Sequence, residues 1–151
     1  MSQENVEIVQ RFFGAIERLL QVSETSRSLL DAMNASDLPP EAKEALGYLT
    51  PDAAWNPLFS GETYEGHPAI ARGWDELREA AENYNSELLE TTDLENDRVL
   101  IVFAVSLEGR ASGIHVDAKI FAVVRFQDRL IARIDEYVER REALEAAKLQ
   151  E

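Results

Sequence analysis

The stretch DRVLIVFAVSLEGRASGIHVDAKIFAVVRFQDRLIARIDEYVE, residues 97–139, decides the fold. It holds three apolar, β-branched segments at 99–107, 114–126 and 130–138, separated by a few polar residues. Links this short join antiparallel neighbours, so the pattern predicts a meander of three long strands. A long sheet with one apolar face must bury that face against another layer. The segments before residue 97 have to supply that layer.

Those earlier segments are mostly helical in pattern, because apolar residues recur at steps of three and four. The chain reads as helices followed by strands, which is typical of an α+β domain, and we expect residues 1–151 to form a single domain. The predicted elements are helices at 3–22, 23–33, 41–49 and 69–83, a short strand at 53–56, a loop with a brief strand at 58–65, a weak strand at 86–95, and a short charged helix or fraying tail after 138.

Composition narrows the classes of partner. The 151 residues carry 29 acidic and 15 basic side chains, a net charge of −14, which disfavours nucleic acid and anionic membranes. There is no run of 18 apolar residues, no sequence typical of a signal peptide at the start and no cysteine. We therefore expect a cytoplasmic protein without membrane spans, disulfides or thiol chemistry.

Alternation along the strands predicts which side chains face the helices. Glu136 is the exception on an otherwise apolar face of the last strand. An unpaired buried charge costs several kcal/mol, so such a carboxyl is normally paired, hydrated or protonated. Either it lies in a cavity where burial raises its pKa into a range useful for acid–base chemistry, or it pairs with an arginine such as Arg11 or Arg72. The inward sets are Val99, Ile101, Phe103 and Val105; Ile114, Val116, Ala118, Ile120, Ala122, Val124 and Phe126; and Leu130, Ala132, Ile134, Glu136 and Val138.

Several aromatic and small residues are candidates to line such a cavity. Small residues on an inward face leave room either for a ligand or, more commonly, for aromatic side chains from a helix. Aromatic residues at helical spacing, such as Phe12 and Trp74, more often belong to a packed core than to a pocket. The candidates are Phe12, Trp55, Asn56, Phe59, Tyr64, Trp74, Phe103, Ala118, Ile120 and Ala122.

Four stretches resemble the SnoaL-like branch of the NTF2-like superfamily. They are NVEIVQRFFGAIERL at 5–19, LTPDAAWNP at 49–57, YEGHPAIARGWDEL at 64–77 and the run from Val124 to Leu144. The resemblance implies a cone, in which N-terminal helices pack into a curved antiparallel sheet. It also implies a choice among isomerase, cyclase, epoxide hydrolase, dehydratase and binding functions, because this fold hosts all of them. The segment 21–40 is longer than is usual in the family.

The known chemistries of the family can be compared with these residues. Ketosteroid-isomerase-like relatives use a carboxylate before a proline and a tyrosine on the first helix, where this chain has Asn56 and Phe12. Neither an amide nor a phenyl ring can perform those steps. Of the three residues used by limonene-epoxide-hydrolase-like relatives, only an acid before a tyrosine, Glu136, has a counterpart. SnoaL-type cyclases resemble the chain in fold and use a single carboxylate, which Glu136 could supply.

We therefore predict a cone that binds a small, largely apolar molecule, with Glu136 as the catalytic acid or base and no metal or organic cofactor. His67 and His115 lie far apart in the sequence and lack metal-binding spacing. The alternative is a non-catalytic module for ligand binding or assembly. Under either hypothesis the resemblance implies a homodimer through the convex sheet face, where alternation places Phe121, Val123, Ile131 and Tyr137.

Overall fold

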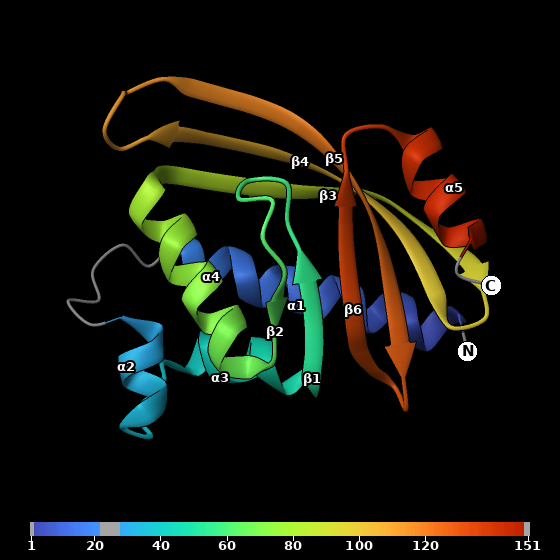
Figure 1. The fold of residues 1–151 in the computed structure, drawn as a ribbon, viewed down its shortest axis with the longest axis horizontal. Helices are drawn as coiled ribbons and strands as arrows, with labels where there is room; N and C mark the ends of the chain where they lie inside the picture. The colour runs from blue at the N-terminus through green and yellow to red at the C-terminus, as the bar shows by residue number, and fades with distance from the viewer. Residues whose placement is uncertain (1, 22–27, 150–151) are drawn as a thin grey trace.

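The computed structural model describes residues 2–21 and 28–149, and it has the predicted α+β architecture (Figure 1). The predicted helix at 23–33 falls partly outside the described residues, and its described part is a helix capped by Ser28. The elements are α1 Ser2–Gln21, α2 Leu29–Asn34, α3 Pro40–Gly47, β1 Leu49–Asn56, β2 Tyr64–Glu65, α4 His67–Ala80, β3 Ala81–Glu95, β4 Arg98–Gly109, β5 His115–Gln127, β6 Leu130–Tyr137 and α5 Arg140–Leu149.

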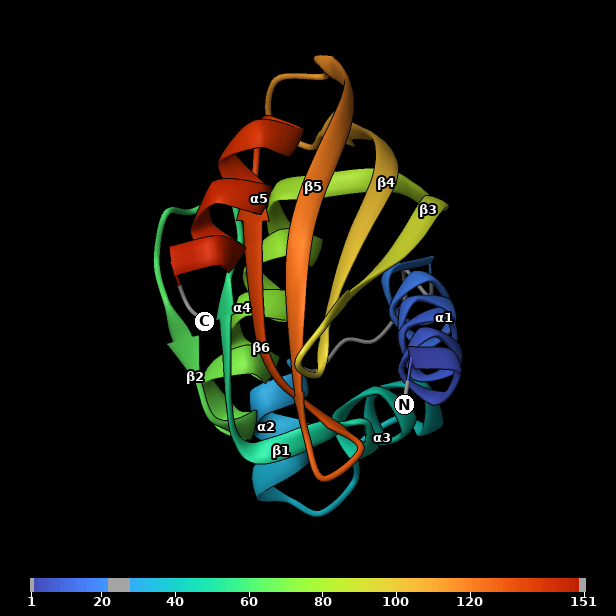
Figure 2. The same ribbon diagram turned by 90° about the vertical axis from the view of Figure 1, so that its right-hand side faces the viewer.

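The described strands form one curved sheet in the order β2-β1-β6-β5-β4-β3. The predicted antiparallel meander of three strands is present as β4, β5 and β6, and β3 extends it by a fourth antiparallel strand. The sheet is nevertheless mixed, because β1 pairs with β6 in parallel and places Trp55 beside Ile134. Seen from the side, the sheet wraps around α1, α3 and α4 and stays open rather than closing into a barrel (Figure 2).

β3 is much longer than the predicted weak strand at 86–95. The predicted helix at 69–83 ends at Ala80, and Ala81 already belongs to β3. β3 pairs with β4 along nearly its whole length, with a register shift between Glu82 and Asn85. Pairing over this length outweighs the helical spacing of the apolar residues in 77–81, which is the usual way that tertiary context overrides local pattern.

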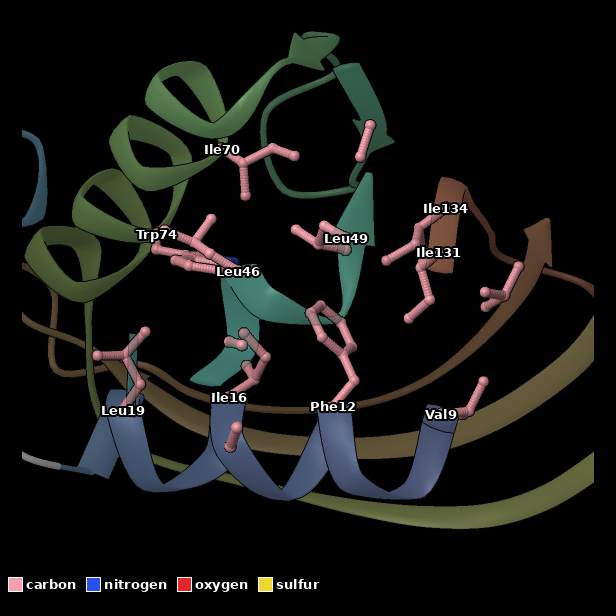
Figure 3. Packing of buried hydrophobic residues seen from close by; sticks show 14 of the residues in the cluster. Val9, Phe12, Ile16, Leu19, Leu46, Leu49, Ile70, Trp74, Ile131 and Ile134 are labelled. Atoms are coloured by element: carbon pink, nitrogen blue, oxygen red, sulfur yellow. The ribbon is translucent and has the colours of Figure 1, made fainter. Parts of the chain in front are cut away.

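The main core lies between the helices and the concave face of the sheet. In Figure 3, the side chains of Phe12 and Ile16 point away from α1 into the space between α1 and α4, where they belong to the same core as Trp74 of α4. The predicted inward set on β4 is confirmed, since Val99, Ile101, Phe103 and Val105 are all buried in this core.

The predicted inward set on β6 is wrong at the start of the strand. A register shift between Arg125 and Phe126 on β5 brings Ile131 opposite Phe126, and Ile131 is 1% exposed in the main core. Leu130 and Ala132 are only half-buried, and Val138 lies beyond the strand end and is exposed. A bulge changes which face each residue occupies, and alternation alone does not reveal one.

The inward set predicted for β5 also fails at its N-terminal end. Ile114, Val116 and Ala118 are exposed. They lie at the end of the β4–β5 hairpin that projects away from the rest of the molecule (Figure 2). An inward face is buried only where another layer covers it, and there the helices do not reach.

α5 covers the convex face where the dimer was predicted. Ala143 and Ala147 pack with Leu100 and Val123 in a second core, against which Phe121 and Tyr137 also lie. The buried Arg98 donates from its guanidinium to the carbonyl oxygen of Ala147. This face is therefore occupied by a helix of the same chain, and Ile131, the fourth residue assigned to it, lies in the main core. The homodimer remains an untested prediction, and the apolar sheet face on which it was based is covered by α5.

The second core predicts a stability difference between two alanines of α5. Ala143 is 0% exposed, whereas Ala146 is half-buried. Ala143→Asp places a carboxylate between α5 and the sheet and should lower the free energy of unfolding by about 2 kcal/mol or more. Ala146→Asp changes the intrinsic helix propensity by the same amount, but it should lower the free energy of unfolding clearly less. Urea denaturation followed by circular dichroism measures both, and equal losses would mean that α5 is not docked.

Candidate functional site

A cavity of about 120 Å³ lies inside the main core, between the helices and the concave face of the sheet. Most of its lining is aliphatic or aromatic, and Glu136 is the one residue with a carboxyl group among the described residues that line it. The lining residues come from α1, β1, the β1–β2 loop, α4, β3, β4, β5 and β6. They are Phe12, Phe13, Ile16, Leu20, Leu49, Ala53, Ala54, Trp55, Phe59, Ile70, Trp74, Leu77, Tyr84, Phe103, Val105, Leu107, Ile120, Ile134 and Glu136.

Strand alternation on β6 places Glu136 at this cavity. It lies opposite the buried Ala122 of β5, two residues after the buried Ile134. Both carboxyl oxygens accept hydrogen bonds: Trp55 donates from Nε1 to Oε2 at 3.0 Å, and the backbone N–H of Leu58 donates to Oε1 at 3.1 Å. β1 and the following loop therefore fix the orientation of the carboxyl group.

Burial raises the pKa of the Glu136 carboxyl above its ordinary value. The hydrogen bonds from Trp55 and Leu58 favour the carboxylate and oppose this effect, but desolvation is the larger influence. The arginine pairing considered from the sequence is not seen for Arg72, which instead bridges Glu62 and Glu76, both at 3.2 Å. A carboxyl group with a raised pKa can give or accept a proton at a higher pH than an ordinary glutamate does.

Tyr84 is a polar lining residue that the sequence analysis missed. Burial raises the pKa of its phenol, the negative charge of Glu136 raises it further, and a hydrogen bond with Ser86 opposes the shift. The hydroxyl therefore stays protonated and can donate. Tyr84 lies on β3, which begins at Ala81. It was missed because the apolar residues just before it have helical spacing, so the strand was predicted to begin only at residue 86.

Six of the predicted cavity residues lie around Glu136. They are contributed by α1, β1, the β1–β2 loop, α4, β4 and β5. Phe59 remains 44% exposed, so it lies at the boundary between the cavity and solvent. The six are Phe12, Trp55, Phe59, Trp74, Phe103 and Ile120.

The other four predicted residues do not line this cavity. Asn56 follows Trp55 on β1 and so faces the opposite side, where it donates to Asp135 at 2.6 Å and accepts from Thr63. Ala122 is buried in the core behind the lining. Ala118 is exposed on the projecting part of β5.

Tyr64, the fourth of them, supports the site from behind. Its hydroxyl donates to Glu76 at 2.5 Å and lies 3.1 Å from the Ser60 hydroxyl. Its ring packs against Trp55, with 5.4 Å between centroids. Tyr64 thus holds the indole that donates to Glu136, although it does not itself reach the cavity.

Gly73 of α4 allows this packing. A Cβ atom at that position would lie 2.9 Å from both Trp55 and Tyr64 ring atoms, closer than real side chains approach. The helix can therefore pack against the two rings only where it has no side chain. The glycine fixes the distance between α4 and β1, and with it the position of the Trp55 indole.

Neither histidine lines the cavity. His67 is the first residue of α4, and its Nε2 lies 3.0 Å from the carbonyl oxygen of Thr50 on β1. His115 lies on the projecting part of β5, with its Nε2 3.0 Å from the Asp117 carboxylate. Among residues 2–21 and 28–149, no cluster of three His, Cys, Asp or Glu side chains could hold a metal ion. No helix in the same ranges is long and apolar enough to cross a bilayer.

Comparison with protein families matches residues 26–134 to the SnoaL-like domain. An NTF2-like protein of unknown function from Burkholderia pseudomallei has a similar structure, with 16% sequence identity and a TM-score of 0.65; the match covers 96% of this chain and 97% of that one. An NTF2-like protein from Burkholderia xenovorans matches with 22% identity and a TM-score of 0.61, and the match covers 97% of each chain. A candidate polyketide cyclase from Xanthomonas campestris matches at 18% identity and a TM-score of 0.64, over 93% and 94%. No curated protein matches. At these identities the structures establish the fold.

The close packing at Gly73 predicts opposite effects for two glycine-to-alanine substitutions in helices. Gly14→Ala on α1 adds a Cβ at an ordinary 3.5 Å from Arg18 and should stabilise by about 0.5–1 kcal/mol, through helix propensity. Gly73→Ala gains the same propensity but forces Trp55 and Tyr64 to move, and should cost a net 1–3 kcal/mol, roughly. Thermal and urea denaturation measure both. Stabilisation by Gly73→Ala would contradict the packing described.

Proposed function

Because the chain belongs to the SnoaL-like domain family, we propose that its cavity binds a small, largely apolar molecule and that Glu136 transfers a proton to or from it. The observation that carries this proposal is a single carboxyl group facing a mostly apolar, aromatic-rich cavity. Few polar groups in an apolar pocket, one of them with a perturbed pKa, form the usual pattern of a ligand site.

The size of the cavity limits the ligand. Typical ligand pockets have volumes of roughly 300 Å³ or more. This cavity, at about 120 Å³, is smaller. An engineered cavity of about 150 Å³ in another protein holds benzene, so a molecule of about one ring fits the present conformation. A larger substrate would require movement of the β1–β2 loop, where Leu58 and Phe59 are exposed.

The chemistry proposed is proton transfer within a cyclisation, isomerisation, dehydration or hydration. Glu136 would act as the acid or base, and the Tyr84 hydroxyl would be the available donor to a developing oxyanion. The ketosteroid-isomerase route remains disfavoured, because Asn56 is an amide directed away from the cavity and Phe12 offers no hydroxyl.

A non-catalytic ligand-binding role is the second candidate, and one observation favours it. Both oxygens of Glu136 already accept hydrogen bonds from the protein, which would suit a carboxyl group that orients the wall of a binding pocket. Turnover of any bound molecule distinguishes the two roles.

Occupancy of the cavity can be measured with a neutral single-ring probe, cyclohexanol. Both tryptophans of the chain, Trp55 and Trp74, line the cavity, so binding should change their fluorescence in a saturable way. Val105→Phe fills the cavity and should abolish the change, whereas Val116→Phe makes the same substitution at an exposed site and should preserve it. Circular dichroism checks that both variants fold. Equal binding by both would reject the cavity as the site.

The acid–base role predicts a loss of turnover that excess substrate does not restore. On a single-ring substrate found by screening, and at saturating concentration, Glu136→Gln should lower kcat by a factor of about 10²–10⁴, because the amide keeps the shape but cannot exchange the proton. Glu87→Gln removes an equal charge from an exposed site on β3 and serves as control. If Glu136 is the base, kcat/KM, which reports the free enzyme, should rise with pH through a pKa above the ordinary glutamate value. An unchanged kcat in Glu136→Gln would favour the binding role.

A further inference from the structure

We propose that the molecule bound in this cavity carries a positive charge, as a small tertiary or quaternary ammonium or a protonated amine. The inference rests on the proposed function, since it names the chemical class of the ligand for the same cavity. Three features of the lining support it: the sign of its one charge, the number of aromatic rings, and the small volume.

The first feature is an uncompensated negative charge. Glu136 is acidic, and no lysine, arginine or histidine belongs to the described lining. Its hydrogen-bond donors, Trp55 and the Leu58 amide, are neutral. Glu17 of α1 accepts a hydrogen bond from the Ser86 N–H at 3.4 Å, two residues along β3 from Tyr84, so a second carboxylate lies near the cavity. A ligand carboxylate or phosphate would be repelled, and a cation would supply the missing counter-charge.

The second feature is the aromatic lining. The rings come from α1, β1, the β1–β2 loop, α4, β3 and β4, so they surround the space beside Glu136 instead of lying on one wall. Aromatic rings attract cations through their quadrupole, most strongly where water is excluded, and groups of them form the usual binding site for quaternary ammonium ligands. Ring centroids lie 5.8 Å apart for Trp55 and Phe59 and 4.9 Å apart for Phe13 and Phe103. The seven lining residues with rings are Phe12, Phe13, Trp55, Phe59, Trp74, Tyr84 and Phe103.

The third feature is the volume, which suits a trimethylammonium group. About 120 Å³ accommodates a compact, nearly spherical head group and excludes long chains or fused rings in the present conformation. A positive centre inside the cavity would also keep Glu136 in its carboxylate form, because a nearby cation favours the charged state of an acid. The ligand itself would thus prepare the residue to accept a proton.

Two probes of nearly identical shape isolate the charge. Choline and 3,3-dimethylbutan-1-ol differ by a nitrogen cation in place of a neutral carbon atom. We expect the wild-type protein to bind choline at least about tenfold more tightly at neutral pH, as a desolvated cation–π site should. Titration followed by tryptophan fluorescence, with calorimetry as a second measurement, gives both dissociation constants.

Two variants test whether the preference for choline depends on the charge of Glu136. Glu136→Gln should remove most of the preference for choline and leave the affinity for the neutral alcohol within a few-fold, roughly, of wild type. Glu87→Gln, with the same loss of charge outside the cavity, should keep the preference. The neutral alcohol binding as tightly as choline would overturn the ligand class but leave the proposed function intact. Failure of both probes, together with cyclohexanol, to bind would overturn both proposals.

Discussion

The desolvation of one carboxyl group, Glu136, is the constraint on which the site depends. The alternation of β6 places it at the concave face, where the packed helices and the β1–β2 loop leave the side chain half-buried. A charge in such a place costs several kcal/mol unless something compensates it. The fold compensates it only in part, with one indole N–H and one backbone N–H. A proton or a cationic ligand can supply the remainder, and both proposals follow from that deficit.

The surrounding structure serves to hold this arrangement still. Gly73 lets α4 approach the Trp55 and Tyr64 rings, Tyr64 is anchored to Glu76, and the parallel pairing of β1 with β6 brings Trp55 next to the strand that carries Glu136. The α5 helix closes the convex face over its own small core. The two faces of one sheet thus carry different features, the cavity with Glu136 on one side and the packed helix α5 on the other.

Much of this could be predicted from the sequence, because long strands with strict alternation leave few choices. The meander, the inward face of β4 and the position of Glu136 all followed from a period of two. The failures have local physical causes. A bulge moved Ile131 inward, the hairpin tip with Ala118 extends beyond its covering layer, and helical spacing before Asn83 hid the strand that carries Tyr84. Asn56 was misassigned because its neighbour Trp55 takes the inward position.

Glu136 is a partly desolvated acid, and the described residues that line its cavity include no lysine, arginine or histidine. The most direct measurement is an NMR titration of its side-chain carboxyl carbon in the ligand-free protein, assigned by comparison with Glu136→Gln. We predict a midpoint clearly above the ordinary glutamate value of about 4.5. A midpoint at or below that value would show that the carboxyl group is solvated or paired and would rule out a desolvated Glu136.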